Sequence, residues 1–286
     1  MPVTDVITSA ANPLAKRIRA LADRRSRRRE GAFVVTGVQP VWRAIEADWS
    51  LDTLVVVPEV LPDSAAEMVA RQSALGVPVA HLSTELAGRL TERDRPPGLL
   101  AVVRTRTTEL EELRVAPDAV LVALHAVGNP GNLGTIVRTV DAAGAAGVIL
   151  IGDTADPFAP AAVKASMGSL FAVPVATAPD TEAFLDWARR NGVHLIATSG
   201  RASARHWSTS YPPPVAIVLG SEGDGLPDDL LAGADQRVAI PMVGTAESLN
   251  LAVAAGLMLY EARRGRVGEG GGPAPLEAHG QESPSR

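Results

Sequence analysis

The chain has 286 residues, 46% of them hydrophobic, and a formal net charge of −5 at pH 7, so it can bury a full core and is long enough for two domains. It has no cysteine, which excludes disulfides, thiolate metal sites and cysteine nucleophiles, and its five histidines are scattered without zinc-site spacing, so we expect no metal. Because it lacks an apolar run of about 18 residues and a basic start followed by a hydrophobic stretch, we expect neither membrane insertion nor secretion, and we assign the protein to the cytoplasm.

The first predicted element is a helix that begins at Asn12, with Pro13 at its first helical position and Leu14, Ile18 and Leu21 on one face. After this helix, strands are predicted over residues 32–35, 53–57, 77–81 and 99–104, and further helices around 38–46 and 65–75. This alternation predicts a small α/β domain over residues 1–105. The polar stretch that follows has no strong apolar repeat, so residues 106–117 are predicted to be a linker.

A basic block overlaps the first helix. Residues 16–29 contain eight of the 27 basic residues and a single acid. Such a block is typical of contact with a phosphate backbone, because each neutralised phosphate releases counterions and no base sequence is needed. A solvated helical face is the alternative. The candidate contact residues are Lys16, Arg17, Arg24, Arg25, Arg27, Arg28 and Arg29.

The second domain, over residues 118–265, alternates strand and helix more regularly. Its strands are too uniformly apolar for a sheet with one wet face, which predicts a mostly parallel sheet with helices on both faces. Strands are expected over 120–124, 147–151, 195–198, 216–219 and 237–240, and helices over 133–143, 159–167, 181–191, 228–233 and 248–264. Residues 266–286 have little to bury and are expected to be disordered.

Three polar clusters follow the ends of strands in this domain, over residues 129–138, 220–226 and 240–250. Gly, Asn, Ser, Glu and Arg gathered at successive strand ends indicate that these ends converge on a bound molecule. Each cluster alone also has a structural interpretation, because glycines permit tight turns and Ser248 could be a plain helix N-cap. A nucleotide-dependent oxidoreductase is disfavoured, because Gly-x-Gly-x-x-Gly does not follow the first strand.

In combination and in this order, the clusters resemble the motifs of the SpoU (TrmH-like) family of RNA ribose 2′-O-methyltransferases, in the SPOUT class. The resemblance is carried by Gly220-Ser-Glu-Gly, Ile240-Pro-Met, Ser248-Leu-Asn and Ala165-Ser-Met-Gly-Ser-Leu-Phe. The first domain, through Phe33-Val-Val-Thr-Gly, is similar to the family's N-terminal substrate-binding domain. Two positions depart from the pattern, since many relatives have Asp in place of Asn129 and Glu in place of Thr36.

The resemblance implies a parallel sheet whose C-terminal segment forms a trefoil knot, an S-adenosylmethionine pocket in the knot loops, and a homodimer. It implies cofactor contacts at Thr198, Gly220, Ile240 and Leu249. Arg138 would activate the ribose hydroxyl, and four residues would organise the site, namely Asn132, Glu222, Ser248 and Asn250. The substrate would be structured RNA, with ribosomal RNA as the first candidate; methylation of transfer RNA and a catalytically silent RNA-binding protein are the alternatives.

Two features refine this expectation. An arginine acting as a literal base is chemically awkward because its pKa exceeds about 12, so we expect Arg138 to hold the nascent alkoxide and an adjacent phosphate. The last predicted helix carries an apolar stripe of Leu249, Val253, Leu257 and Tyr260. The stripe fits a dimer contact or ordinary core.

Overall fold

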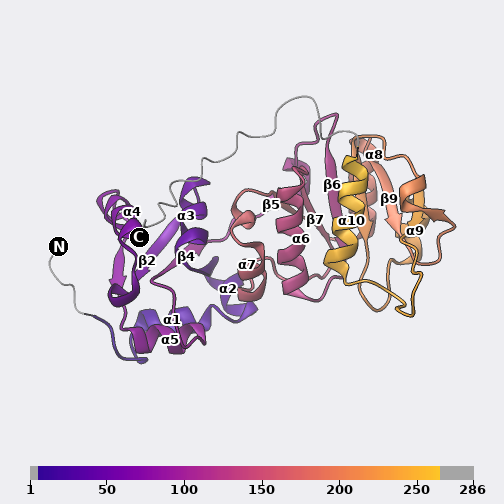
Figure 1. Ribbon diagram of the computed structural model, residues 1–286. Coiled ribbons are helices and arrows are strands. Elements are labelled where there is room, and N and C mark those ends of the chain that lie inside the picture. Colours follow the sequence, from indigo (N-terminus) through magenta and orange to yellow (C-terminus); the bar gives the residue numbers. More distant parts are fainter. Residues whose placement is uncertain (1–5, 265–286) are drawn as a thin grey trace, which may run out of the picture.

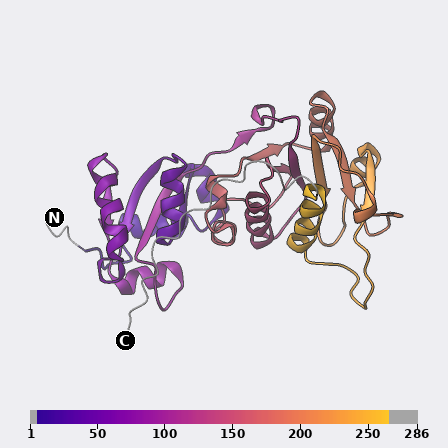
Figure 2. The same cartoon turned by 45° about the horizontal axis from the view of Figure 1, so that its top comes forward.

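The computed structural model describes residues 6–264, which form two α/β blocks, each built on its own sheet (Figure 1). The predicted disordered tail, residues 266–286, and the predicted domain end at 265 lie outside the described residues. Both views place the blocks side by side, with the region around α7 (Pro160–Ser166) at their junction (Figures 1 and 2). Across residues 6–264, no helix combines the length and apolar character that crossing a membrane requires.

The N-terminal block has a four-stranded sheet in the order β1-β4-β2-β3. Its strands are β1 (Ala32–Thr36), β2 (Leu51–Val56), β3 (Val79–His81) and β4 (Leu99–Arg104). Strand β4 is antiparallel to both β1 and β2, whereas β3 is parallel to β2. Side chains alternate across β4, so Leu100 and Val102 enter one core while Leu99, Ala101 and Val103 enter the other.

Helices cover both faces of this sheet. They are α1 (Pro13–Ala20), α2 (Arg24–Glu30), α3 (Val38–Glu46), α4 (Asp63–Ala74) and α5 (Thr84–Thr91), with a 3₁₀ turn η1 (Pro58–Val60). The predicted cap of α1 is confirmed, since Asn12 Oδ1 accepts a hydrogen bond from Leu14 N at 2.9 Å. The basic block is divided between two helices, because Asp23 caps a second one by accepting from Ser26 N at 2.9 Å.

The second block has an eight-stranded sheet in the order β10-β12-β9-β11-β6-β7-β8-β5, and every neighbouring pair is parallel. The strands are β5 (Thr108–Glu109), β6 (Val120–His125), β7 (Gly147–Ile151), β8 (Val175–Ala178), β9 (His194–Thr198), β10 (Ala204–Arg205), β11 (Val215–Leu219) and β12 (Gln236–Ala239). All five predicted strands are present. The sequence did not predict β5, β8 and β10, which are two to four residues long.

Helices lie on both faces of this sheet, as the apolar strands predicted. They are α6 (Pro130–Ala142), α7, α8 (Thr181–Arg190), α9 (Asp228–Gly233) and α10 (Leu251–Arg263), with 3₁₀ turns η2 (Leu110–Glu112), η3 (Ser169–Phe171) and η4 (His206–Ser208). Buried residues of α6, α7 and α10 belong to the core that contains Val122 of β6, and buried residues of α8 and α9 belong to the core that contains Leu121.

The predicted linker, residues 106–117, differs in the structure from an independent connection. Its strand β5 pairs with β8, and Leu110 and Leu113 are buried in the core on the α8 side of the sheet. In the sequence, charged residues flank these two leucines. The two apolar residues three positions apart were therefore not recognised as a buried segment. Thr108 and Glu109 are therefore the edge strand of the second sheet, and the two leucines after them belong to its core.

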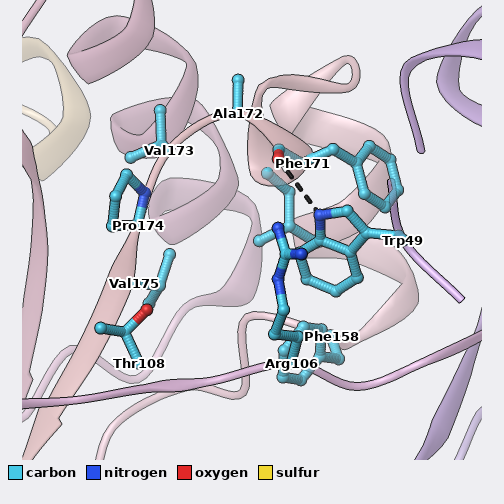
Figure 3. A pocket seen from close by; sticks show the side chains of 10 residues that line it. Trp49, Arg106, Thr108, Phe158, Phe171, Ala172, Val173, Pro174 and Val175 are labelled. Atoms are coloured by element: carbon cyan, nitrogen blue, oxygen red, sulfur yellow. Dashed lines mark hydrogen bonds between the residues drawn. The ribbon is translucent and has the colours of Figure 1, made fainter. Parts of the chain in front are cut away.

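The two blocks share one continuous core at their junction. Phe33 and Trp49 of the N-terminal block pack against Phe158 and Phe171 of the second block, with ring centroids 4.8 Å apart for Phe33 and Phe158 and 5.2 Å apart for Trp49 and Phe171. Trp49 Nε1 also donates to the Phe171 carbonyl oxygen at 3.1 Å, beside a cavity of about 110 Å³ (Figure 3). The Arg106 guanidinium lies 4.6 Å from the Trp49 ring centre.

Candidate active site

Two adjacent strands carry the first two polar clusters to the same edge of the sheet. Strands β6 and β11 are neighbours and parallel, so the residues that follow them meet there. Asn132 Nδ2 donates a hydrogen bond to Glu222 Oε1, and Asn250 Nδ2 donates to Asn132 Oδ1 at 3.0 Å. The structure therefore joins one residue from each of the three clusters in a chain of hydrogen bonds.

The first cluster forms the start of α6, three residues earlier than predicted. Asn129 is its N-cap, because Asn129 Oδ1 accepts from Gly131 N at 2.8 Å and Asn132 N at 3.2 Å. Gly134 lies against α7, where a Cβ atom would fall 2.2 Å from the carbonyl oxygen of Ala162. The α6 start is thus fixed by its own cap and by close helix packing.

Arg138 lies farther along α6 and is not part of the hydrogen-bond chain. It is six residues beyond Asn132, which corresponds to a rise of about 9 Å along a helix. Its side chain is exposed, and it forms no ion pair with any described residue. The guanidinium is therefore available to an anionic group outside this chain.

The second cluster is a loop that folds back on itself after β11. Gly225 N donates to Ser221 O at 3.1 Å, and a Cβ atom on Gly220 would lie 2.2 Å from the Gly225 carbonyl group. Position 220 therefore requires glycine because the two sides of the loop touch there. Glu222 is exposed in this loop, where its carboxylate meets Asn132.

The third cluster corrects one expectation. Helix α10 was predicted to begin at Ser248, but it begins at Leu251, and Asn250 is its cap through hydrogen bonds from Ala252 N at 2.9 Å and Val253 N at 3.4 Å. Ser248 is exposed and does not cap the helix. Its hydroxyl is therefore open to a ligand, whereas Asn250 combines a cap with its bond to Asn132.

The four predicted cofactor contacts lie in or next to the strand ends and loops at this same edge. Thr198 ends β9 and donates through Oγ1 to the Val218 carbonyl oxygen at 3.1 Å. Gly220 follows β11, Ile240 follows β12, and Leu249 lies two residues before α10. Strands β12, β9, β11 and β6 are consecutive in the sheet. The four predicted cofactor contacts therefore border the hydrogen-bonded cluster of Asn132, Glu222 and Asn250.

The backbone of residues 241–249 fits a polar ligand. In the described part of the chain, none of its amide or carbonyl groups bonds to another backbone group, so donors and acceptors remain available along the segment. Met242 and Leu249 add exposed apolar side chains. This combination suits a cofactor that has both a flat aromatic base and charged polar groups.

The basic block is heterogeneous in the structure. Lys16, Arg25, Arg28 and Arg29 are exposed, and so is Arg19, which the sequence did not single out. Arg17 instead pairs with Asp52 at 2.7 Å and Glu30 at 2.9 Å. These hydrogen bonds, the one with Asp52 first, raise the pKa of Arg17. Arg24 pairs with Asp153 at 3.1 Å on the surface.

Arg27 does not fit its predicted role in contacting phosphate. Its side chain is 3% exposed, and its Nε and Nη2 atoms lie 2.9 Å and 2.7 Å from Asp156 Oδ2. A buried and fully paired guanidinium cannot reach a phosphate without breaking this pair. A run of consecutive arginines gives no sign in the sequence of which one points inward.

The apolar stripe of α10 lies on the surface of this chain and is not ordinary core. Val253 is 51%, Leu257 43% and Tyr260 56% exposed. Together with Gly256 of the same helix, Leu257 and Tyr260 line a groove that includes His206 of η4. Among residues 6–264, no group of three or more side chains could hold a metal ion.

Comparison with known proteins finds two family models on this chain. Residues 119–260 match the SpoU rRNA Methylase family, and residues 12–101 match an MRM3-like substrate binding domain.

Individual relatives are similar over nearly the whole chain. A 23S rRNA (uridine(2479)-2′-O)-methyltransferase of Streptomyces viridochromogenes is 34% identical over 86% of this chain and 88% of its own length. A 23S rRNA (guanosine(2553)-2′-O)-methyltransferase, RlmP, of Bacillus subtilis is 30% identical over 90% and 98%. The solved AdoMet-bound rRNA methyltransferase of Sinorhizobium meliloti superposes with a TM-score of 0.85, at 39% identity over 91% of this chain and 97% of that one.

Proposed function

Because the chain belongs to the SpoU rRNA Methylase family, we propose that it transfers a methyl group from S-adenosylmethionine to a ribose 2′-hydroxyl of ribosomal RNA. The observation that carries this proposal is the hydrogen-bonded cluster of Asn132, Glu222 and Asn250 at the sheet edge. The Streptomyces and Bacillus relatives are named as 2′-O-methyltransferases of 23S rRNA, and the Sinorhizobium structure holds AdoMet. These names favour ribosomal over transfer RNA.

We assign the cofactor to the loops that contain Thr198, Gly220, Ile240 and Leu249, with the free backbone of residues 241–249 as its main source of hydrogen bonds. When bound, S-adenosylmethionine supplies a methyl group activated by its sulfonium centre. The protein must then orient a ribose hydroxyl and stabilise the charge that develops on its oxygen.

Arg138 is the proposed catalytic residue for that charge. A guanidinium stays protonated at neutral pH and offers several donors in a fixed plane, so Arg138 holds the nascent alkoxide and an adjacent phosphate. The proton of the hydroxyl leaves toward that phosphate or solvent. The exposure of Arg138 and its lack of an ion pair among the described residues support this role.

The remaining four residues organise the site. Asn132 receives a hydrogen bond from Asn250 and donates one to Glu222, so each amide is held in one orientation. Ser248 adds an exposed hydroxyl on the loop that precedes Asn250. These groups place the loops around the reacting atoms, while Arg138 acts on charge.

Four further assignments complete the proposal. The exposed arginines of α2, together with Lys16, bind the RNA backbone. The α10 stripe contacts a second copy of the chain, because three exposed apolar side chains on one helix favour burial between subunits. The C-terminal segment of the second block forms a trefoil knot whose loops hold the cofactor, as the family resemblance implies, and the protein acts in the cytoplasm.

Two measurements test the function. Calorimetry with S-adenosylmethionine should show binding, and mapping of 2′-O-methylated nucleotides in cells with and without the protein should show that one ribosomal position depends on it. Absence of cofactor binding would leave a silent RNA-binding module. A dependent position found only in transfer RNA would overturn the assignment to ribosomal RNA.

A further inference from the structure

The burial of Arg27 sets it apart from its helix neighbours. Arg25 and Arg28, on either side of it in α2, are exposed, whereas Arg27 is 3% exposed. Besides its two contacts with Asp156, its Nη1 atom donates to the carbonyl oxygens of Leu21 and Ala22 at 3.0 and 2.7 Å. A planar guanidinium held on several sides fixes how α2 lies against the loop that carries Asp156.

That loop, residues 152–159, joins β7 to α7 and also contacts the segment that precedes α6, the helix that carries Arg138. Its Ala155 N donates to the Val127 carbonyl oxygen at 2.6 Å, and Val127 lies two residues before Asn129, the cap of α6. The basic helix α2 is therefore linked to the start of α6 by the Arg27–Asp156 pair, by Ala155, which is next to Asp156 in the chain, and by its hydrogen bond to Val127.

The Asp156 carboxylate also holds one of the aromatic residues that pack between the two blocks. Asp156 Oδ1 accepts from Phe158 N at 2.8 Å, and the Phe158 ring packs on Phe33 with centroids 4.8 Å apart. Asp156 thus contributes to both the ion pair and the packing. By contrast, Asp153 on the same loop reaches Arg24 only through an exposed pair, with side chains 90% and 40% exposed.

We propose that Arg27 and Asp156 are positioning residues for methyl transfer. Their buried pair holds the exposed RNA-binding arginines of α2 at a fixed distance from Arg138, so that an RNA bound on α2 presents its target ribose to the catalytic site. This inference rests on the proposed function. Arg27 itself contacts no RNA, and the substrate must carry its recognised backbone segment at a set distance from the methylated nucleotide.

Two matched variants test the proposal, Asp156→Asn and Asp153→Asn. Both remove one carboxylate from the same loop and leave every α2 arginine in place, so we expect RNA affinity in filter binding to stay within about two-fold of the natural protein. At saturating RNA and S-adenosylmethionine, the single-turnover rate should fall at least about ten-fold for Asp156→Asn, because small misplacements of the reacting groups are costly. It should stay within about two-fold for Asp153→Asn, whose pair is exposed.

A double variant gives a readout that a purely structural role would not predict. Arg27→Gln/Asp156→Asn removes both buried charges, so no unpaired guanidinium is left in the core and the stability lost in Asp156→Asn should be largely recovered. The neutral pair no longer fixes α2 against the loop of residues 152–159. We therefore expect the single-turnover rate of the double variant to stay low although the protein is folded.

The outcomes separate the two proposals. A natural protein that methylates no RNA would contradict the proposed function. An Asp156→Asn rate equal to that of Asp153→Asn, or one that falls only with the unfolded fraction, would overturn the positioning role. If Asp156→Asn does not fold, Arg27→Gln/Asp156→Asn decides, because a folded double variant with the rate of the natural protein would show that the pair is not needed for positioning.

Discussion

Asn250 donates a hydrogen bond to Asn132, with Nδ2 3.0 Å from Oδ1, although 118 positions separate the two residues in the chain. The same side chain caps α10 through its oxygen atom. Asn250 therefore links the start of the last helix to the orientation of Asn132, and the two roles use different atoms.

The two roles of Asn250 can be separated by substitution. Asn250→Asp keeps an oxygen that caps α10 but replaces the donor with a second acceptor facing Asn132 Oδ1. We expect urea unfolding to be nearly unchanged and the methyl-transfer rate to fall. Asn250→Ala should lose both, with a cost of about 1 kcal/mol in the free energy of unfolding. Equal rates for Asn250→Asp and the natural protein would show that the link to Asn132 is not needed.

Arg138→Ala should abolish most methylation while leaving cofactor binding nearly intact. Removing a group that stabilises transition-state charge lowers kcat by about 100- to 1,000-fold, and Arg138 is not among the residues that we assign to the cofactor. Arg138→Lys keeps the charge but not the planar set of donors, so it should recover only part of the rate. Calorimetry and single-turnover assays give the two readouts. Full activity of Arg138→Ala would remove this residue from the mechanism.

Neutralising the exposed arginines of α2 should weaken RNA binding and flatten its salt dependence. We expect Arg25→Gln/Arg28→Gln/Arg29→Gln to reduce the slope of log affinity against log salt by about 0.7 to 0.9 for each phosphate that is no longer neutralised. Filter-binding titrations at several salt concentrations provide the slope. An unchanged affinity and slope would mean that these side chains form only a solvated face.

A charge placed in the α10 stripe should produce monomers. In Leu257→Glu, a carboxylate would be buried without a partner between two copies of the helix, which is costly. Light scattering after size exclusion measures the mass. Leu75→Glu is the matched control, because Leu75 is 72% exposed at the end of α4 in the other block. A monomeric natural protein would contradict the dimer assignment.

Tyr211 should titrate late. Burial, followed by the nearby Glu261 charge, raises the pKa of Tyr211 to about 12. The folded state keeps a proton that an unfolded tyrosine releases near its ordinary pKa of 10.0, so this contribution to stability is complete below pH 10 and is lost as the pH rises toward 12. The chain has two tyrosines, so absorbance at alkaline pH in Tyr260→Phe isolates Tyr211. A midpoint near 10 would contradict the burial effect.

The convergence of the three polar clusters could be predicted from the sequence, because each cluster follows an apolar strand and parallel strands end on the same side of a sheet. The choice of Asn132, Glu222 and Asn250 within the clusters came from the family resemblance, and the structure joins these three residues by hydrogen bonds. Which arginine of α2 is buried could not be predicted from the sequence. Arg27 and Arg28 are the same type of residue, and they differ only in the residues that each of them faces in the folded protein. Strand β8 was missed because Val-Ala-Thr-Ala is short and weakly apolar. Helix α2 carried a readable signal in Asp23, which precedes it as a cap.

The strand β5 and the two leucines after it determine where this protein can be divided. A fragment starting at residue 118 would leave β8 with an unpaired outer side and would uncover the apolar surface that Leu110 and Leu113 occupy. The unpaired side of β8 would favour strand pairing between two copies of the fragment during expression. Any fragment of the second block that is made from this chain or exchanged into another protein should therefore begin before Thr108, so that the sheet keeps its edge strand β5.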